Sequence, residues 1–370
     1  MNPNLAPKPT TNQPLLGGGG VTLTVVLLSV LLSGCGIGYV VRSAYFQAEL
    51  LASRTPVDEI LAAGGLNDLQ RAKLLEIRDI KAFGEEIGLK PTQNYGTVAM
   101  NWNRTNWILS ACPPLSFQPK TWWFPIVGEV PYLGFFKQKD ADRWQRKLES
   151  QGYEVYRRVA GAYSTLGWFR DPILLLMLEW DTYQLADTVL HEMVHATLWI
   201  RGSVKFNESF ANFVGEAAAF RYLGNRYGAD APVHLGAIQL KEDRDQWRAV
   251  LVELYANLDE VYKDRTLSET EKQNRKAALF TSLRKRVAGV EFHDTARFLE
   301  MAKGTWNNAR MMHYRTYNHN RDRFQALLDE ENGDLLRFIG RIQVITQKRK
   351  NPFKALDEAT ESSRAEGIIR

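Results

Sequence analysis

Two histidines stand four residues apart in the run His191-Glu192-Met193-Val194-His195, an H-E-x-x-H pattern. Residues four apart lie on one face of a helix, so both imidazoles can point at one metal ion. Glu192, one position after the first histidine, can then reach a water molecule beside that ion and act as a general base. Apolar residues at helical spacing flank the pattern: Leu185, Ala186, Val189, Leu190, Val194 and Leu198. This context favours a buried helix over the alternative of two histidines on a solvated helix surface.

A catalytic zinc ion usually has three protein ligands. After a short loop, 201–206, the chain continues Asn207-Glu208-Ser209-Phe210-Ala211. Asn207 is a typical N-cap, and Glu208 would open a second helix. If that helix folds back antiparallel, Glu208 reaches the open face of the metal, and we therefore predict one Zn²⁺ held by His191, His195 and Glu208. The alternative is that Glu208 is an ordinary acid, favoured by the dipole at a helix N-terminus.

The sequence patterns around these residues predict the elements that position them, and together they indicate an α+β fold that is mainly helical. Residues 183–223 have the pattern of a helix, a short loop and a second helix, as in zincin-like sites. A long, charged helical hairpin is predicted over residues 236–290. We interpret its charged residues as a face that is exposed to solvent. Residues 291–347 are helical again, and the polar tail after Pro352 is expected to be loose.

A strand-rich section is predicted over residues 97–160, where aromatic and β-branched residues are interrupted by Pro and Gly. Within it, 121–128 and 132–136 predict two strands of one hairpin with a turn near 129–131.

The first 35 residues contain no acid and one base, Lys8. Their apolar run, 21–32, has the length of a signal-peptide core and is short for a membrane-spanning helix. It ends in Leu-Ser-Gly-Cys, which resembles a lipobox. We therefore predict a lipoprotein signal peptide over 1–35, a lipid anchor on Cys35 and a single metallopeptidase domain over 36–370. The alternative is an uncleaved anchor helix that continues through 39–41.

Either interpretation places the body of the protein in the cell envelope of a bacterium, facing the periplasm. Gly36 is not the Asp that retains lipoproteins at the inner membrane, which favours the outer membrane. The chain has 47 basic and 42 acidic residues without a dense basic block, so we expect no nucleic-acid partner. Cys112 is the second of two cysteines, which excludes a disulfide framework if Cys35 carries lipid. We expect Cys112 to be a small buried apolar residue.

Several further motifs follow one another along the chain: Trp-Phe-Pro-Ile-Val-Gly at 123–128, Ala-Tyr-Ser-Thr-Leu-Gly-Trp-Phe at 162–169, Asp171-Pro172, Phe-Asn-Glu-Ser-Phe-Ala at 206–211 and Asn307-Asn308-Ala309. Together with H-E-x-x-H and in this order, they resemble the bacterial lipoprotein family described as "putative aminopeptidase". The similarity covers nearly the whole mature chain. Two His and a downstream Glu also resemble the ligand set of the thermolysin-like peptidases, or gluzincins.

The resemblance implies a peptide substrate and hydrolysis by zinc-activated water. It also implies a further hydrogen-bond donor for the oxyanion. Tyr317 is the favoured candidate, and Tyr163, His313 and His319 are alternatives. The chain departs from the family at Trp123 and Glu129, where many relatives are expected to carry cysteines, and at Leu133, where an Arg is usual. A family disulfide is therefore absent here.

Three further expectations complete the prediction. Asp187, Asn212 and Glu216 have the helical spacing to orient the histidines. No Gly-x-Met-Glu-Asn motif for a substrate amine occurs, so exopeptidase specificity rests on the resemblance. The alternatives are a zinc hydrolase acting on another amide, and a lipid-anchored scaffold or chaperone-like protein with structural zinc, in which Glu192 would have no task.

Overall fold

The computed structural model describes residues 36–365, apart from 103, 125–127, 161–169 and 318–319. The chain divides into two units, Met1–Ala48 and Glu49–Arg370, and helix α2 (Gly36–Ala52) contains the boundary. The predicted signal peptide and Cys35 lie outside the described residues, and the single domain over 36–370 stays a prediction. Within the described part, no helix combines the length and the apolar character needed to cross a membrane.

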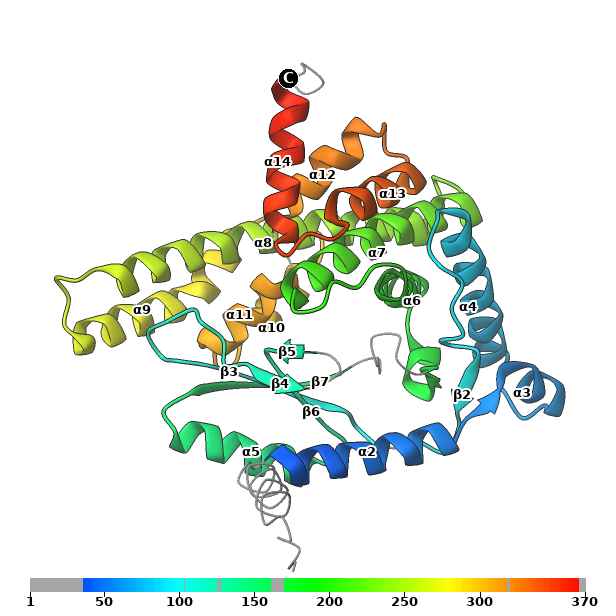
Figure 1. Cartoon of the computed structure of the whole chain (residues 1–370), viewed down its shortest axis with the longest axis horizontal. Coiled ribbons are helices and arrows are strands. Elements are labelled where there is room, and N and C mark those ends of the chain that lie inside the picture. The colour runs from blue at the N-terminus through cyan, green and yellow to red at the C-terminus, as the bar shows by residue number, and fades with distance from the viewer. Residues whose placement is uncertain (1–35, 103, 125–127, 161–169, 318–319, 366–370) are drawn as a thin grey trace, which may run out of the picture. The chain divides into compact units, whose positions relative to one another are not determined.

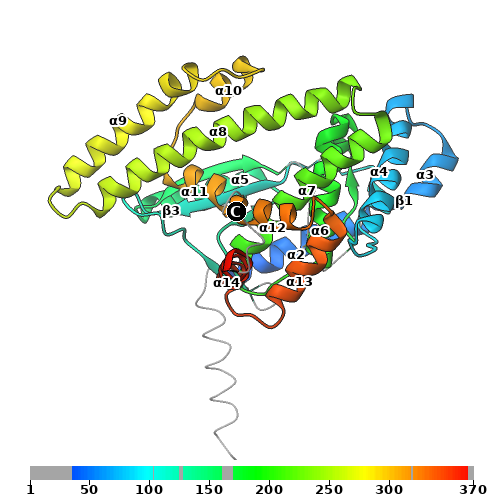
Figure 2. The same cartoon turned by 90° about the horizontal axis from the view of Figure 1, so that it is seen from above.

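The second unit is mainly helical with small sheets, which confirms the predicted fold class (Figure 1). Its helices are α3 (Val57–Ala63), α4 (Asp68–Glu86), α5 (Gln138–Ser150), the 3-10 helix η1 (Leu175–Glu179), α6 (Thr182–Thr197), α7 (Val204–Tyr227), α8 (Pro232–Lys263), α9 (Glu269–Ala288), α10 (Thr295–Ala302), α11 (Asn308–Tyr317), α12 (Arg321–Glu330), α13 (Leu335–Thr346) and α14 (Pro352–Ala365). α8 and α9 run alongside each other as the hairpin expected over 236–290 (Figure 2).

The described strands are short and form small sheets. They are β1 (Thr55–Pro56), β2 (Thr97–Ala99), β3 (Trp107–Cys112), β4 (Trp122–Phe124), β5 (Gly128–Val130), β6 (Leu133–Phe135), β7 (Glu154–Val159) and β8 (Ile173–Leu174). Their orders are β1-β2-β8, β6-β3-β7 and β4-β5. The strand β3 pairs antiparallel with β6 and with β7, and α5 packs on this sheet.

The predicted hairpin between 121–128 and 132–136 is wrong. β4 pairs with β5, so that Trp123 lies opposite Glu129, the two positions where the resemblance predicts cysteines in relatives. Gly128 starts β5 with φ of 80°, a left-handed conformation that lets the chain turn earlier than expected. β6 pairs with β3 instead, because Leu133 and Phe135 alternate along β6 and are both buried there.

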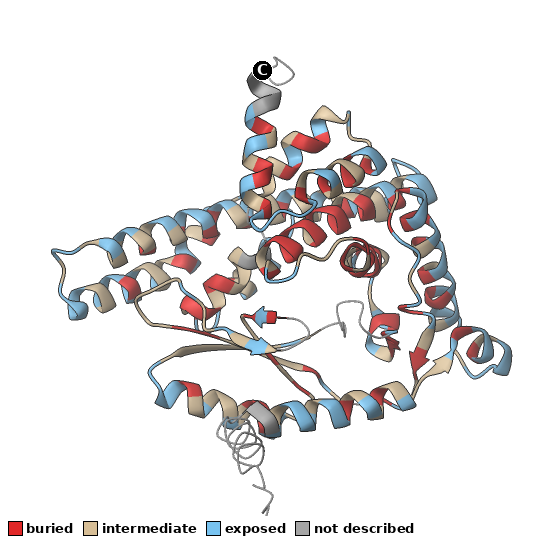
Figure 3. Ribbon diagram, viewed as in Figure 1, coloured by how far each residue is buried: buried red, intermediate tan, exposed pale blue. Residues whose placement is uncertain are grey.

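One face of α7 is buried (Figure 3), and its phenylalanines pack against the C-terminal helices. Phe206, Phe210 and Phe213 are almost fully buried, and their rings contact those of Phe324 and Phe338.

The tail after Pro352, expected to be loose, is the helix α14. The ring of Phe353 lies 5.3 Å from that of Phe206, and Leu356 is fully buried. The prediction failed because it weighed the polar residues of the tail and overlooked the apolar face that Phe353 and Leu356 give to this helix.

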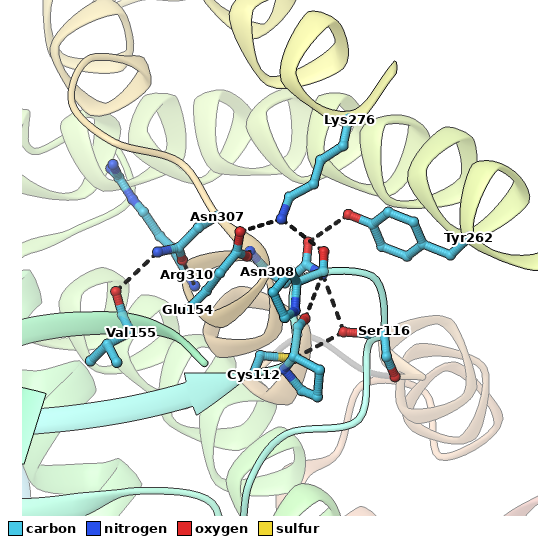
Figure 4. A network of polar contacts seen from close by, with 11 residues as sticks. Cys112, Ser116, Glu154, Val155, Tyr262, Lys276, Asn307, Asn308 and Arg310 are labelled. Carbon is cyan, nitrogen blue, oxygen red and sulfur yellow. Dashed lines mark hydrogen bonds and ion pairs between the residues drawn. The ribbon is translucent and has the colours of Figure 1, made fainter. Parts of the chain in front are cut away.

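Asn308, the first residue of α11, is fully buried and joins this helix to the strand section (Figure 4). Its backbone N donates to Glu154 Oε2 at 2.8 Å, and its Nδ2 donates to the carbonyl of Pro114 at 2.9 Å. Its Oδ1 accepts from the hydroxyl of Tyr262 at 2.7 Å. Lys276 of α9 donates to both Glu154 and Pro114. The network therefore fixes α11 against β7, the end of β3, α8 and α9.

Candidate metal centre

Helix α6 carries both histidines, and its rotation about its own axis is set by its surroundings. Asp181 caps the first turn, accepting from the backbone N of Gln184 at 2.7 Å. Most apolar residues of α6 are fully buried, and the helix packs against α4 and α7 (Figure 3). His191 and His195, four residues apart, therefore lie together on the face of α6 that its apolar side chains do not occupy.

Helix α7 carries Glu208, and the neighbouring Asn207 closes the loop between α6 and α7. The Oδ1 of Asn207 accepts from Ile200 N and its Nδ2 donates to Ile200 O, both at 2.9 Å. α7 begins at Val204, so the prediction that Asn207 caps this helix is wrong. Its amide pairs with the backbone of the preceding loop instead. α7 packs along α6 with Glu208 in its second turn.

The structure brings the three predicted ligands together. Glu208 Oε2 lies 3.6 Å from Nε2 of His191 and 3.8 Å from Nε2 of His195. Ligand atoms about 2.0–2.2 Å from an ion in tetrahedral geometry are about 3.3–3.6 Å apart. Glu208 and His195 are buried, whereas His191 is partly exposed. With a small adjustment this group could therefore hold one metal ion and leave it accessible from one side.

The charges around the group favour a cation. Burial alone would raise the pKa of Glu208, but the imidazoles of His195 and His191 outweigh it and hold the pKa of this carboxyl well below its usual range. Burial alone would lower the pKa of His191, but the hydrogen bond to Glu208 and the carboxylates of Glu192, Glu208 and Asp187 raise it. Three carboxylates thus act on one imidazole, and a divalent ion would relieve their mutual repulsion.

The carboxylate of Glu192 is buried, and its Oε2 has no hydrogen-bond partner among the described residues. The hydroxyl of Tyr95 is also buried without such a partner. Burial, then the charges of Glu192 and Asp171, raise the pKa of Tyr95 well above its usual value, so its hydroxyl lies within electrostatic range of Glu192. Each of these two buried polar groups is therefore left with a hydrogen bond open to a water molecule or a substrate group.

Tyr95 was not anticipated from the sequence. It lies in the loop before β2 with φ of 60°, a conformation that is rare for an aromatic residue and is often found at functional sites. The loop composition gives no sign of it beyond the adjacent Gly96.

Of the acids predicted to orient the histidines, Asp187 lies at His191. A Cβ atom on Gly215 would lie 3.1 Å from Asp187 Oδ1 and 3.2 Å from His191 Cβ, so both residues face the same point of α7. Glu216 forms an ion pair with Arg321 and is not among the residues that act on His191.

The predicted oxyanion donors are described only in part. Tyr163, His319 and the side chain of Tyr317 lie outside the described residues, so the role of Tyr317 stays a prediction. His313 of α11 is described. Burial and the cation of Arg158 lower the pKa of His313 to about 3, while the carboxylate of Glu208 acts in the opposite direction. His313 is therefore a neutral imidazole within electrostatic range of the metal centre.

The profile of one protein family, described as "Putative aminopeptidase", matches residues 38–356. The chain belongs to this family. The matched range contains the H-E-x-x-H run and Glu208, so the aminopeptidase family match includes the whole metal-binding group. No curated protein and no solved structure matches the chain. Hydrolysis of peptide bonds is thus the activity that the family description supports.

Proposed function

We propose that this member of the aminopeptidase family is a zinc-dependent peptidase, with His191, His195 and Glu208 as the zinc ligands. The observation that carries the proposal is a set of two imidazoles and one carboxylate beside a buried glutamate, Glu192, whose Oε2 has no hydrogen-bond partner among the described residues. Two nitrogen donors and one carboxylate are a ligand set of catalytic zinc, which keeps a fourth position for water. Bound zinc would polarise the scissile carbonyl and lower the pKa of water.

The residues of the chain carry out the proton transfers. Glu192 takes a proton from the attacking water and later delivers it to the leaving amine. No donor in the described part of the chain occupies its Oε2, which suits this task. Asp187 keeps His191 in its orientation, and Tyr317 donates a hydrogen bond to the oxyanion.

Metal analysis together with the variant Glu192→Gln tests the proposal. The purified protein should contain stoichiometric zinc. The variant should keep this zinc and lose peptidase activity by about 10²–10⁴-fold. Glu260→Gln, which changes an exposed acid of α8, is the matched control and should keep full activity. A protein that binds no zinc, or a Glu192→Gln variant with unchanged activity, contradicts the proposal.

Aminopeptidase specificity is the finer part of the proposal, and the family description supports it. Peptides with a free N-terminal amine should be cleaved, and their N-acetylated forms should not. Efficient cleavage of N-acetylated, internally quenched peptides would identify an endopeptidase instead. Cleavage of other amides alone would identify a hydrolase of non-peptide substrates, and stoichiometric zinc without hydrolysis would favour the scaffold with structural zinc.

We also propose that the protein is a lipoprotein of the bacterial cell envelope, anchored through Cys35 and facing the periplasm from the outer membrane. The apolar run before Leu-Ser-Gly-Cys and the Gly at position 36 support this. The mature N-terminus should be a lipidated Cys35, and Cys35→Ser should abolish lipidation. A native protein that retains Met1 would favour the uncleaved anchor helix.

A further inference from the structure

Two cationic side chains stand on the helix that carries Glu208, α7, and on the helix that packs against it, α11. Lys205 is the second residue of α7, three residues before Glu208. Residues three apart on a helix are neighbours on its surface, here separated by about 4.5 Å along the axis. Arg315 lies on α11, which packs against α7. Both side chains are half-buried.

Neither cation has an acidic partner within the described residues. Burial, and then the charge of Arg315, lowers the pKa of Lys205 to about 8. Burial lowers the pKa of Arg315, and no carboxylate acts against it. The two cations therefore form an electropositive patch that has no counter-ion among the described residues.

This arrangement costs stability in three ways. Lys205 loses hydration, it is repelled by Arg315, and it stands in the first turn of a helix, where the dipole disfavours a cation. Local features that cost stability without a compensating contact are expected where a protein binds a ligand. A bound anion would offset all three costs.

The guanidinium of Arg315 is oriented by aromatic rings. Its Cζ lies 4.0 Å from the ring centroid of Tyr255, which stacks on Phe117 at 4.2 Å. Stacking of this kind holds the guanidinium by its flat face, so the N–H donors at its edge are left for a planar anion. A carboxylate accepts two parallel hydrogen bonds from such an edge.

We propose that Lys205 and Arg315 form a subsite that binds a carboxylate of the substrate next to the scissile bond. The inference rests on the proposed peptidase function and adds to it a substrate class. An extended peptide spans about 3.3–3.6 Å per residue. Because Lys205 stands one helical turn before Glu208 on α7, the subsite suits a carboxylate one or two residues from the cleaved bond. That carboxylate belongs either to the C-terminus of a short peptide or to an acidic side chain.

The test measures binding rather than turnover, in a zinc-loaded Glu192→Gln protein. Isothermal titration compares a tripeptide acid with its C-terminal amide, and an amidated peptide containing Glu with the same peptide containing Gln. A preference for the free acid identifies the C-terminal carboxylate, and a preference for Glu over Gln identifies the acidic side chain. One of these preferences should be about tenfold or more.

Variants in the same background assign the preference to the pair. Lys205→Met and Arg315→Gln should each reduce it, and the double variant should abolish it. Lys139→Met is the matched control, because Lys139 is also the second residue of its helix, α5, but is exposed. It should leave the preference unchanged. Lys205→Met should also unfold at the same or a higher temperature than its parent, so a failure to fold cannot explain the loss.

The outcomes separate the two proposals. Equal binding of charged and amidated peptides, or a preference that survives in the double variant, overturns the subsite while the peptidase function stands. A selective subsite in a protein whose parent cleaves no peptide supports the subsite and overturns the proposed function.

Discussion

Gly215 of α7 lies against the backbone of Asp187 in α6. A Cβ atom at position 215 would lie 3.0 Å from the carbonyl oxygen of Asp187 and 3.2 Å from the Cβ of His191. The absence of a side chain here lets α7 approach α6 directly at the turn that carries His191. The spacing between the ligand helices, and so between His191 and Glu208, therefore depends on this glycine.

Gly215→Ala should push the two helices apart. Because the added methyl group meets backbone, the helices must shift, at a cost of about 1–3 kcal/mol. Zinc affinity should fall roughly tenfold or more, as measured by competition with a chelator. The control is Gly236→Ala in α8, where an added Cβ has no neighbour within 4 Å. It should stabilise the protein by about 0.5–1 kcal/mol and leave zinc affinity unchanged. Equal zinc affinity in both variants would show that the close approach does not position the ligands.

The metal-free protein should lose stability as the pH rises above 6.5, because of His191. The folded state raises the pKa of His191 above its ordinary value of 6.5, so its stabilising contribution is present below that pH and is lost as the pH passes through the raised value. Glu208 has a lowered pKa, so its contribution is present above about 4.5 and is lost in acid.

Urea unfolding in the presence of a chelator, at pH 5.5 and at pH 8, measures this effect. The partner Glu208 is removed in Glu208→Gln, so the difference in stability between parent and variant should be larger at pH 5.5. The folded state lowers the pKa values of His313 and Lys205, so their effect on stability changes with pH in the opposite direction. Both residues are present in the parent and in the variant. A difference that is independent of pH would argue against the coupling of His191 to Glu208.

Much of the local structure was predictable, because it depends on neighbours in the sequence. The spacing of His191 and His195 on one helix follows from the period of the α-helix, and so does the hairpin of α8 and α9. What failed depends on contacts between distant segments. Asn207 could cap its own helix or pair with Ile200, and only the folded loop decides. β6 could pair with β4 or with β3, and the burial of Leu133 decides.

The environment of the metal-binding group was less predictable than its ligands. Tyr95 comes from a loop about a hundred residues before Glu192 in the chain, and Arg315 follows Lys205 by a similar distance. Neither stands in a motif, so no spacing rule connects the members of these pairs. Their proximity results from the packing of α11 against α7 and from the loop that precedes β2.

Cys112 should be unreactive in the folded protein. Its side chain is fully buried, and its Sγ donates to the carbonyl of Ser116 at 3.0 Å. Burial, and then the charge of Glu154, raises the pKa of the thiol to about 12, against the opposing effect of Lys276. Only about one thiol in 10⁴ would be a thiolate at pH 8. Iodoacetamide should therefore leave Cys112 unmodified in the native protein and alkylate it in guanidinium chloride, as peptide mass mapping can measure. Rapid labelling of the native protein would contradict this environment.

Asn308 and Tyr262 should stabilise the protein jointly, because the hydroxyl of Tyr262 donates to Asn308 Oδ1 at 2.7 Å inside the buried network. Tyr262→Phe removes this bond, at a cost of about 1 kcal/mol. Asn308→Ala also leaves the carbonyl of Pro114 without its amide donor and should cost about 2–4 kcal/mol.

If the two residues act through their shared bond, the double variant should lose less stability than the sum of the single losses, by about 0.5–1.5 kcal/mol. Unfolding in urea measures all members of this cycle. The control Asn257→Ala, on another face of α8, should change stability by less than about 0.5 kcal/mol. Strictly additive losses would mean that α11 is held by its apolar contacts and that the bond between Asn308 and Tyr262 contributes nothing to its position.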